Sequence, residues 1–313
     1  MEQRKIVVVG AGFVGMTCAQ RVVEQGLGDC VLIDIVEGRP QGVALDLNQA
    51  GPVVGYEGVV TGTNDPKDTD GADLVIVTAG LPRKPGMDRS DLLDVNAKII
   101  LNVADYVREG SPQARVIVIT NPLDSMTHLM RARTGFAPER VVGMAGVLDS
   151  ARFRTFLAES LSMGRREVEA MVLGGHGDSM VPVRAYASAG GIPVEELMAA
   201  DTFDAIADRT RNGGAEIVAH LKTGSAYYAP SASAVAMAAS ILNDERRIFP
   251  AAALLNGPYG LEGVTLGVPV VLGSAGVERI VELNLTAEDR AALHHSGAEV
   301  QADLDLLAEK GLL

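Results

Sequence analysis

The sequence contains few aromatic residues and few lysines. It has no tryptophan, aromatic residues make up only 4% of it, and lysine accounts for only six of its 27 basic residues. Surfaces that bind single-stranded nucleic acids stack the bases on aromatic rings set among lysines and arginines. The formal net charge of −13 would also repel a phosphate backbone or an anionic lipid surface. We therefore expect neither nucleic acid nor membrane as a partner.

Cysteines and long apolar runs are scarce as well. Cys18 and Cys30 have neither CxxC nor metal-ligand spacing, so we expect buried free thiols and no metal site. No apolar run reaches membrane-spanning length, and the first residues lack the basic, apolar and small-residue pattern of a secretion signal. These features predict a cytoplasmic protein.

The first half of the sequence alternates short apolar runs with helical patterns. Strands are expected over residues 5–9, 30–33, 74–78, 115–120 and 141–143, and helices over 13–25 and 96–109. Parallel strands joined by right-handed helical crossovers leave few topologies other than a doubly wound sheet. The prediction is an α/β fold with a Rossmann sheet.

The pattern changes after about Gly146. Helices are expected over 148–161, 201–221 and 225–242 and from Thr286 onward, with a strand over 170–173, a hairpin over 181–194 and a β region over 248–281. We therefore predict two parts: a Rossmann domain over residues 1–146 and an α+β substrate domain over residues 147–313.

A glycine-rich motif follows the first strand and opens the first helix. Its residues are Gly10, Ala11, Gly12, Phe13, Val14 and Gly15. In this context a GxGxxG sequence lets the backbone approach a pyrophosphate at a helix N-terminus. Asp34 ends the next strand, where a carboxylate can accept hydrogen bonds from both ribose hydroxyls and would repel a 2′-phosphate. The prediction is an NAD site.

One histidine stands out among the five. His176 lies in a glycine-rich loop after a predicted strand, whereas His128, His220, His294 and His295 are expected to be structural or solvated. An imidazole can hold or release a proton near neutral pH, as the oxidation of a hydroxyl group requires.

Two charged residues, Asp149 and Arg152, share one face at the start of a predicted helix. Alone, this spacing is typical of a surface ion pair. In a dehydrogenase, the same pair can orient an imidazole and bind a carboxylate through the guanidinium fork.

A cationic loop follows the strand over residues 74–78, at the sheet edge where ligands bind. It contains Arg83, Lys84 and Arg89 with proline and glycine around them, and it is either a solvated loop or a lid that closes over an anion. Asn121 ends another strand at the same edge and can donate or accept a hydrogen bond there.

These motifs together resemble the lactate/malate dehydrogenase family over essentially the whole chain. GAGFVG, TAGLPRKPGMDR, ITNPLD, GVLDSARF and GGHGD occur in the family's order and spacing. The resemblance implies that His176 is the acid/base, Asp149 its carboxylate partner and Arg152 the clamp for the substrate's C1 carboxylate. It also implies that Arg89 polarises the carbonyl, that Asn121 contacts the substrate oxygen, and that Asn96, Ile119, Thr120 and Asn121 contact the nicotinamide and its ribose.

Substrate choice within this family turns largely on the position of Arg83, which is glutamine in typical lactate dehydrogenases. Arg83 can pair with a second carboxylate, and leaving a sequestered guanidinium unpaired costs about 3 to 5 kcal/mol, or about two to four decades. The resemblance therefore implies NAD-dependent interconversion of malate and oxaloacetate, a tricarboxylic acid cycle reaction. The segment TGSAYYAPSAS is similar to the lactate-dehydrogenase-like branch, which implies a homo-oligomer, a tetramer rather than a dimer.

Two alternatives stay open from the sequence. One is a lactate or broad 2-hydroxyacid dehydrogenase, which the substitution Arg83→Gln and a comparison of oxaloacetate with pyruvate would distinguish. The other is a non-catalytic NAD-binding sensor. Binding NAD alone would not require His176, Asp149, Arg152 and Arg89 together, and a turnover assay separates this alternative from an enzyme.

Overall fold

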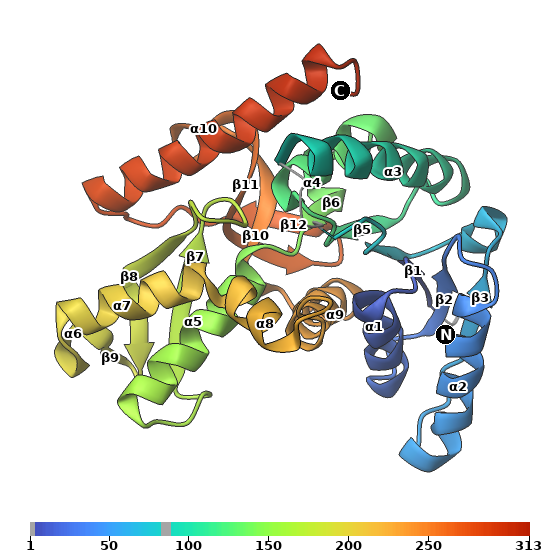
Figure 1. Cartoon of the computed structure of the whole chain (residues 1–313), viewed down its shortest axis with the longest axis horizontal. Coiled ribbons are helices and arrows are strands. Elements are labelled where there is room, and N and C mark those ends of the chain that lie inside the picture. The colour runs from blue at the N-terminus through green and yellow to red at the C-terminus, as the bar shows by residue number, and fades with distance from the viewer. Residues whose placement is uncertain (1–3, 83–88) are drawn as a thin grey trace.

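The chain folds around a nine-stranded sheet with flanking helices, beside which lies a separate three-stranded sheet (Figure 1). The computed structural model describes residues 4–82 and 89–313. The order of the large sheet is β12-β11-β10-β6-β5-β4-β1-β2-β3.

Six parallel strands make up the part of this sheet that the first half of the chain supplies. They are β1 (Lys5–Val9), β2 (Asp29–Ile33), β3 (Val60–Thr63), β4 (Leu74–Val77), β5 (Arg115–Val118) and β6 (Val141–Gly143). Their order, β3-β2-β1-β4-β5-β6, is that of a doubly wound dinucleotide-binding sheet. Central strands such as β4 are buried along their whole length because helices cover both faces. The predicted Rossmann sheet is confirmed.

The elements of this half that were not predicted include α2 and β3. The helices are α1 (Phe13–Glu24), α2 (Arg39–Val54), α3 (Arg89–Gly110) and α4 (Leu123–Thr134), with short 3₁₀ turns η1 (Pro66–Thr69) and η2 (Pro138–Arg140). Helix α2 contains Pro52 and buries only Pro40, Ala44 and Gly51, so it shows no clear apolar stripe. Strand β3 is a short edge strand with only two buried residues. Helix α3 begins at Arg89, earlier than the expected start near Asn96.

The second half of the chain extends the large sheet as well as forming the small one. Strands β10 (Arg247–Asn256), β11 (Glu262–Gly273) and β12 (Gly276–Ile280) are antiparallel, and β10 joins β6 through Ala252 and Gly143. One apolar core runs from Ile6 to Leu307, and a second, smaller core includes Phe153. The two halves thus share a sheet and a core, and the predicted boundary between residues 146 and 147 stays a prediction.

The small sheet carries the loop that contains His176. It consists of β7 (Val168–Leu173), β8 (Val181–Ala189) and β9 (Ile192–Pro193), and β8 and β9 form the expected hairpin over 181–194. The remaining elements are α5 (Gly146–Leu161), α6 (Val194–Leu197), α7 (Ala200–Arg211), α8 (Gly213–Leu221), α9 (Tyr228–Leu242), η3 (Pro258–Gly260) and α10 (Ala287–Glu309). The single helix expected over 201–221 is therefore two helices, which meet at Asn212.

Both thiols lie inside the core. Cys18 and Cys30 are free and buried, as expected, and burial raises the pKa of the Cys18 thiol to about 12. Within the described residues, no helix combines the length and the apolar composition that crossing a bilayer requires.

Candidate active site

The three glycines of the GxGxxG motif have three different surroundings. Gly10 has a φ of +102° and lies so close to β4 that a Cβ would come within 2.7 Å of Thr78 Oγ1. A Cβ on Gly15 would lie 1.7 Å from the carbonyl oxygen of Gly10, so α1 can pack here only without a side chain. A Cβ on Gly12 would meet nothing within 4 Å, and no side chain caps the N-terminus of α1 at this residue. The loop therefore fits a pyrophosphate that approaches Gly12.

The other residues of the motif divide between core and surface. Ala11 is fully buried and Val14 packs partly against the core, whereas Phe13 is 56% exposed. The ring of Phe13 stacks on Tyr227, with 5.2 Å between the ring centroids. Helix α9 thus begins beside the glycine loop, a proximity that the sequence did not indicate.

Asp34 lies at the end of β2 next to the glycine loop, where the sequence places it. Its Oδ2 accepts a hydrogen bond from the backbone N–H of Ala11 at 2.6 Å, and its Oδ1 accepts one from Val36 at 2.9 Å. The backbone N–H of Gly10 donates to the carbonyl oxygen of Ile33 at 2.7 Å. These bonds hold the carboxylate at the carboxyl edge of the sheet, the position that suits a ribose.

Asn96 joins two strand ends at the same edge. Its side chain is fully buried, and Nδ2 donates to the carbonyl oxygen of Asn121 at 2.7 Å and to that of Leu81 at 3.1 Å. Its Oδ1 accepts from the backbone N–H of Leu81 at 2.8 Å. Asn96 therefore fixes the backbone at Leu81 and at Asn121, and its expected contact with the cofactor stays a prediction.

The remaining residues predicted for the nicotinamide side follow β5. Ile119 and Thr120 are buried, and Thr120 Oγ1 donates to the carbonyl oxygen of Ala79 at 2.7 Å. Asn121 is exposed at the end of this run. Of the three, Asn121 has the side chain that is free to reach a ligand at the sheet edge.

His176 and Asp149 form a hydrogen-bonded pair. His176 Nδ1 donates to Asp149 Oδ2 at 2.7 Å, and the side chains of His176 and Asp149 are 15% and 2% exposed. The histidine comes from the loop between β7 and β8, and the aspartate from the first turn of α5. Because Nδ1 is engaged by the carboxylate, Nε2 is the nitrogen left to exchange a proton with a ligand.

Arg152, which lies on α5 like Asp149, completes a charged triad with Asp149 and His176. Its Nη1 lies 3.1 Å from Asp149 Oδ1, and its side chain is only 13% exposed. Its Nε is buried and has no hydrogen-bond partner among the described residues. Gly213 and Gly214 at the start of α8 leave room for it, since a Cβ on Gly213 would lie 3.1 Å from Arg152 Cδ. The guanidinium thus retains donors for an anion, as the expected carboxylate clamp requires.

The charges around His176 favour its protonated form. Burial alone would lower its pKa, but the charge of Asp149 and the hydrogen bond to it, with a further contribution from Asp124, outweigh both burial and the charge of Arg152. The pKa of His176 is therefore raised, and the imidazole is poised to act as an acid near neutral pH.

Asp124 is a site residue that the sequence reasoning missed. It lies in the first turn of α4 and is 5% exposed, and its Oδ2 accepts a hydrogen bond from the backbone N–H of His176 at 2.8 Å. Burial raises the pKa of Asp124 to about 6. The available signal was an acidic residue just after Asn121 at the ligand-binding edge, but nothing in the sequence connects it to His176.

The structure describes the residues of the cationic loop only in part. Arg83 and Lys84 lie outside the described residues. Arg89 begins α3, and only its backbone is described. Their expected contacts with substrate stay predictions.

The other histidines have structural or solvated settings, as expected for His128, His294 and His295. His128 Nδ1 lies 3.1 Å from Thr265 Oγ1, and burial lowers its pKa to about 4, so it is neutral at physiological pH. His294 Nε2 donates to the carbonyl oxygen of Tyr259 at 2.8 Å, and His295 is exposed beside Glu299. His176 is thus distinguished from these three by a buried carboxylate partner and by its place in a loop.

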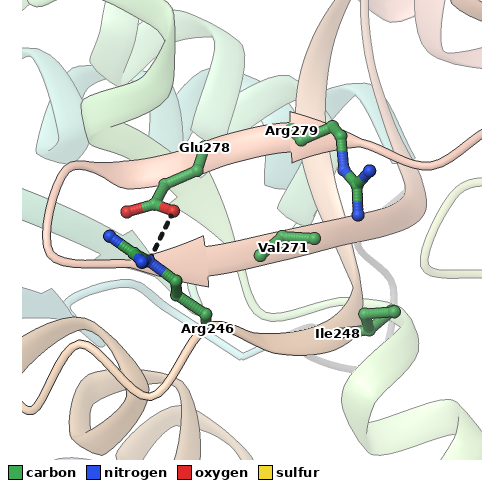
Figure 2. Close-up of a pocket in the computed structure, with 5 residues that line it drawn as sticks. All are labelled: Arg246, Ile248, Val271, Glu278 and Arg279. Atoms are coloured by element: carbon green, nitrogen blue, oxygen red, sulfur yellow. Dashed lines mark ion pairs between the residues drawn. The ribbon is translucent and has the colours of Figure 1, made fainter.

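A surface pocket elsewhere contains none of the predicted site residues. It lies on β10, β11 and β12 and is lined by Arg246, Ile248, Val271, Glu278 and Arg279 (Figure 2). Arg246 Nε already pairs with Glu278 Oε2 at 3.1 Å (Figure 2). The pocket offers no imidazole, and its one carboxylate, Glu278, is already paired with Arg246, so we do not assign the chemistry to it.

Two family models match nearly the whole chain. Residues 4–143 match the model described as lactate/malate dehydrogenase, NAD binding domain, and residues 146–310 match the model described as lactate/malate dehydrogenase, alpha/beta C-terminal domain. A protein of Rhodopirellula baltica named malate dehydrogenase is 53% identical over 298 residues, which are 95% of each chain.

Solved structures of both named activities are similar to this chain. Malate dehydrogenase from Cryptosporidium parvum has a TM-score of 0.96 at 42% identity, covering 98% of this chain and 99% of that one. Lactate dehydrogenase from the same organism, in complex with lactic acid and NAD, has a TM-score of 0.95 at 43% identity, with the same coverage. Backbone similarity therefore does not separate the two substrates.

Proposed function

The chain belongs to the lactate/malate dehydrogenase family, and we propose that it catalyses the NAD-dependent, reversible oxidation of (S)-malate to oxaloacetate, a step of the tricarboxylic acid cycle. The observation that carries this proposal is the triad of His176, Asp149 and Arg152. It combines a proton-exchanging imidazole, a buried carboxylate 2.7 Å from it and a buried guanidinium with an unpaired donor. A 2-hydroxy acid needs these groups at its hydroxyl and its carboxylate.

The proton moves through His176. Its Nε2 takes the proton of the C2 hydroxyl group during oxidation and returns it during reduction, since Nδ1 stays bonded to Asp149. Asp149 stabilises the imidazolium and fixes the orientation of the ring. Bound NAD supplies the acceptor for the hydride that leaves C2.

Four further residues would hold the substrate. Arg152 pairs with the C1 carboxylate through the donors that Asp149 leaves free. We assign the second carboxylate to Arg83, polarisation of the reacting carbonyl to Arg89 and a hydrogen bond at the substrate oxygen to Asn121. In this scheme NAD binds first, and the lid closes after malate has docked.

The cofactor site comprises the glycine loop and the neighbouring strand ends. The backbone of Gly10 to Gly15 would bind the pyrophosphate and Asp34 the adenosine ribose, because a Cβ on Gly12 has open space and Asp34 adjoins the loop. Asn96, Ile119, Thr120 and Asn121 would form the nicotinamide side. A carboxylate at Asp34 favours NAD over NADP.

We also propose a homo-oligomer, a tetramer rather than a dimer, located in the cytoplasm. Helix α2 exposes three large apolar side chains, Leu45, Val53 and Val54, and α8 exposes Val218 and Leu221. Exposed apolar side chains of this kind favour burial against another subunit. The cytoplasm is proposed because it holds a pool of NAD, which the reaction needs.

The test is NADH oxidation by the purified protein with saturating oxaloacetate, run beside pyruvate and repeated with NADPH. We expect fast turnover that is largely confined to oxaloacetate and NADH. Arg83→Gln should lower kcat/KM for oxaloacetate about a hundredfold or more and reduce the preference over pyruvate. Equal turnover of pyruvate by the parent would contradict the substrate, and NADH binding without turnover would indicate a sensor.

A further inference from the structure

Three consecutive residues of the His176 loop are held by three different elements. Gly174 exchanges two backbone hydrogen bonds with Gly267 of β11, at 2.8 and 3.2 Å. The backbone N–H of Gly175 donates to Ser296 Oγ of α10 at 2.7 Å, and Ser296 is fully buried. The backbone N–H of His176 donates to Asp124 Oδ2 of α4 at 2.8 Å. The histidine backbone is thus fixed independently of its ring.

The anchor of the His176 N–H, Asp124, is a carboxylate, whereas the anchor of the Gly175 N–H is the uncharged hydroxyl oxygen of Ser296. Burying a carboxylate is costly unless charged or donor groups surround it. Asp124 is 5% exposed, and its Oδ1 has no hydrogen-bond partner in the part of the chain that the structure describes. A neutral acceptor would hold the same N–H at lower cost. Anchoring the N–H therefore does not by itself account for a buried negative charge, whereas stabilisation of the adjacent imidazolium does.

We propose that Asp124 is a second positioning carboxylate of the active site, which fixes the backbone of His176 from α4 while Asp149 fixes its ring from α5. This inference rests on the proposed function, because it assigns Asp124 a task in the proton transfer by His176. In this proposal Asp124 acts through His176 and does not contact the substrate.

Besides burial, which lowers the pKa of His176, three charged groups among the described residues shift it. Asp149 and Asp124 favour the imidazolium from α5 and α4, and Arg152 of α5 opposes it. The other anchors, Ser296 of α10 and the backbone of Gly267 in β11, carry no charge. Removing the charge of Asp124 should therefore lower the pKa of His176, whereas removing an uncharged anchor should loosen the loop without this shift.

The experiment compares four variants with the parent across pH. Asp124→Asn keeps an acceptor and loses the charge, Asp124→Ala loses both, and Ser296→Ala removes the neighbouring anchor. Asp303→Asn is the matched control, because Asp303 is also a buried carboxylate beside α4 and its Oδ2 accepts a hydrogen bond from Ser125 Oγ. The readouts are the pH profile of kcat/KM for oxaloacetate and an NMR titration of the C2 proton of His176.

Reduction of oxaloacetate needs protonated His176, so activity falls on the alkaline side. We expect Asp124→Asn to move the alkaline limb and the NMR titration of His176 to lower pH. Asp124→Ala should in addition lower kcat about tenfold to hundredfold relative to Asp124→Asn, about the effect of losing a charged hydrogen bond. Ser296→Ala should lower kcat without moving either midpoint, and Asp303→Asn should move neither.

Superimposable titrations of His176 in the parent and in Asp124→Asn would overturn the proposal, as would an equal shift in Asp303→Asn. The NMR titration needs no substrate. If the parent fails to turn over oxaloacetate, the proposed function fails while the role of Asp124 is still decided. If Asp124→Ala does not fold, the isosteric Asp124→Asn decides it.

Discussion

Asp149 determines both the orientation and the charge of the residue proposed to transfer the proton. It is bonded to His176 at 2.7 Å and to Arg152 at 3.1 Å. Asp149→Asn removes the main interaction that raises the pKa of His176. We expect kcat to fall about a hundredfold to ten-thousandfold and the alkaline limb of oxaloacetate reduction to move to lower pH. Steady-state kinetics from pH 5 to 10 test this, and an unmoved limb would contradict it.

Asp34 provides a prediction for cofactor choice at the same scale. Asp34→Ala should raise KM for NADH about tenfold or more and narrow the gap between NADH and NADPH, because a carboxylate beside the ribose hydroxyls repels a 2′-phosphate. Glu37→Gln is the matched control, since Glu37 is an exposed carboxylate on the following turn. If both variants keep the parent's ratio of NADH to NADPH turnover, Asp34 does not select the cofactor.

The buried carboxylate of Asp124 should also affect stability. Its pKa is raised from 3.8 to about 6 by burial, so the folded state binds more protons than the unfolded state between these values. Stability conferred by its neutral form is therefore lost as the pH rises through this window. The free energy of unfolding of Asp124→Asn, measured in urea, should rise relative to that of the parent by up to about 3 kcal/mol between pH 4 and 7. A difference that does not change with pH would refute this.

At the scale of elements, strand β11 fixes the start of the His176 loop through close backbone contact. A Cβ on Gly267 would lie 2.4 Å from the carbonyl oxygen of Gly174. Gly267→Ala should therefore displace the loop, cost about 1 to 3 kcal/mol of stability and lower kcat more than it changes KM for NADH. In the control Gly164→Ala, a Cβ meets only Glu167 Cγ at 3.9 Å, so both quantities should stay near the parent's values.

At the scale of the whole molecule, the exposed apolar side chains of α2 provide a test of assembly. Leu45 is 61% exposed and Val53 is 87% exposed. Leu45→Asp should lower the mass measured by light scattering after gel filtration, because burying an unpaired charge in an interface costs several kcal/mol. Met163→Asp, at an exposed apolar residue outside α2 and α8, should leave the mass unchanged. A monomeric parent would rule out the oligomer.

Much of the architecture was predictable because its signals are local. Apolar runs over 5–9, 74–78 and 141–143 gave buried parallel strands, since such strands are hydrophobic on both faces. Helix α2 was missed because proline and glycine within it are typical of loops and because it buries too few side chains to show an apolar stripe. The extension of the large sheet by β10, β11 and β12 was missed because strand pairing across the two halves leaves no periodic trace in the sequence.

The sequence by itself determined the chemical groups of this protein: the glycine loop with Asp34, the loop histidine His176, and an acid and an arginine on one helical face. Each is defined by a short motif or, for Asp34, by its place at the end of the next strand of the same βαβ unit, and bond geometry and helical spacing fix such relations locally. Only the tertiary structure decided that Asp124 and Ser296, which are 52 and 121 residues from their partners, hold the histidine loop. Contacts between distant segments depend on how whole elements pack, and no local pattern of residues records that packing.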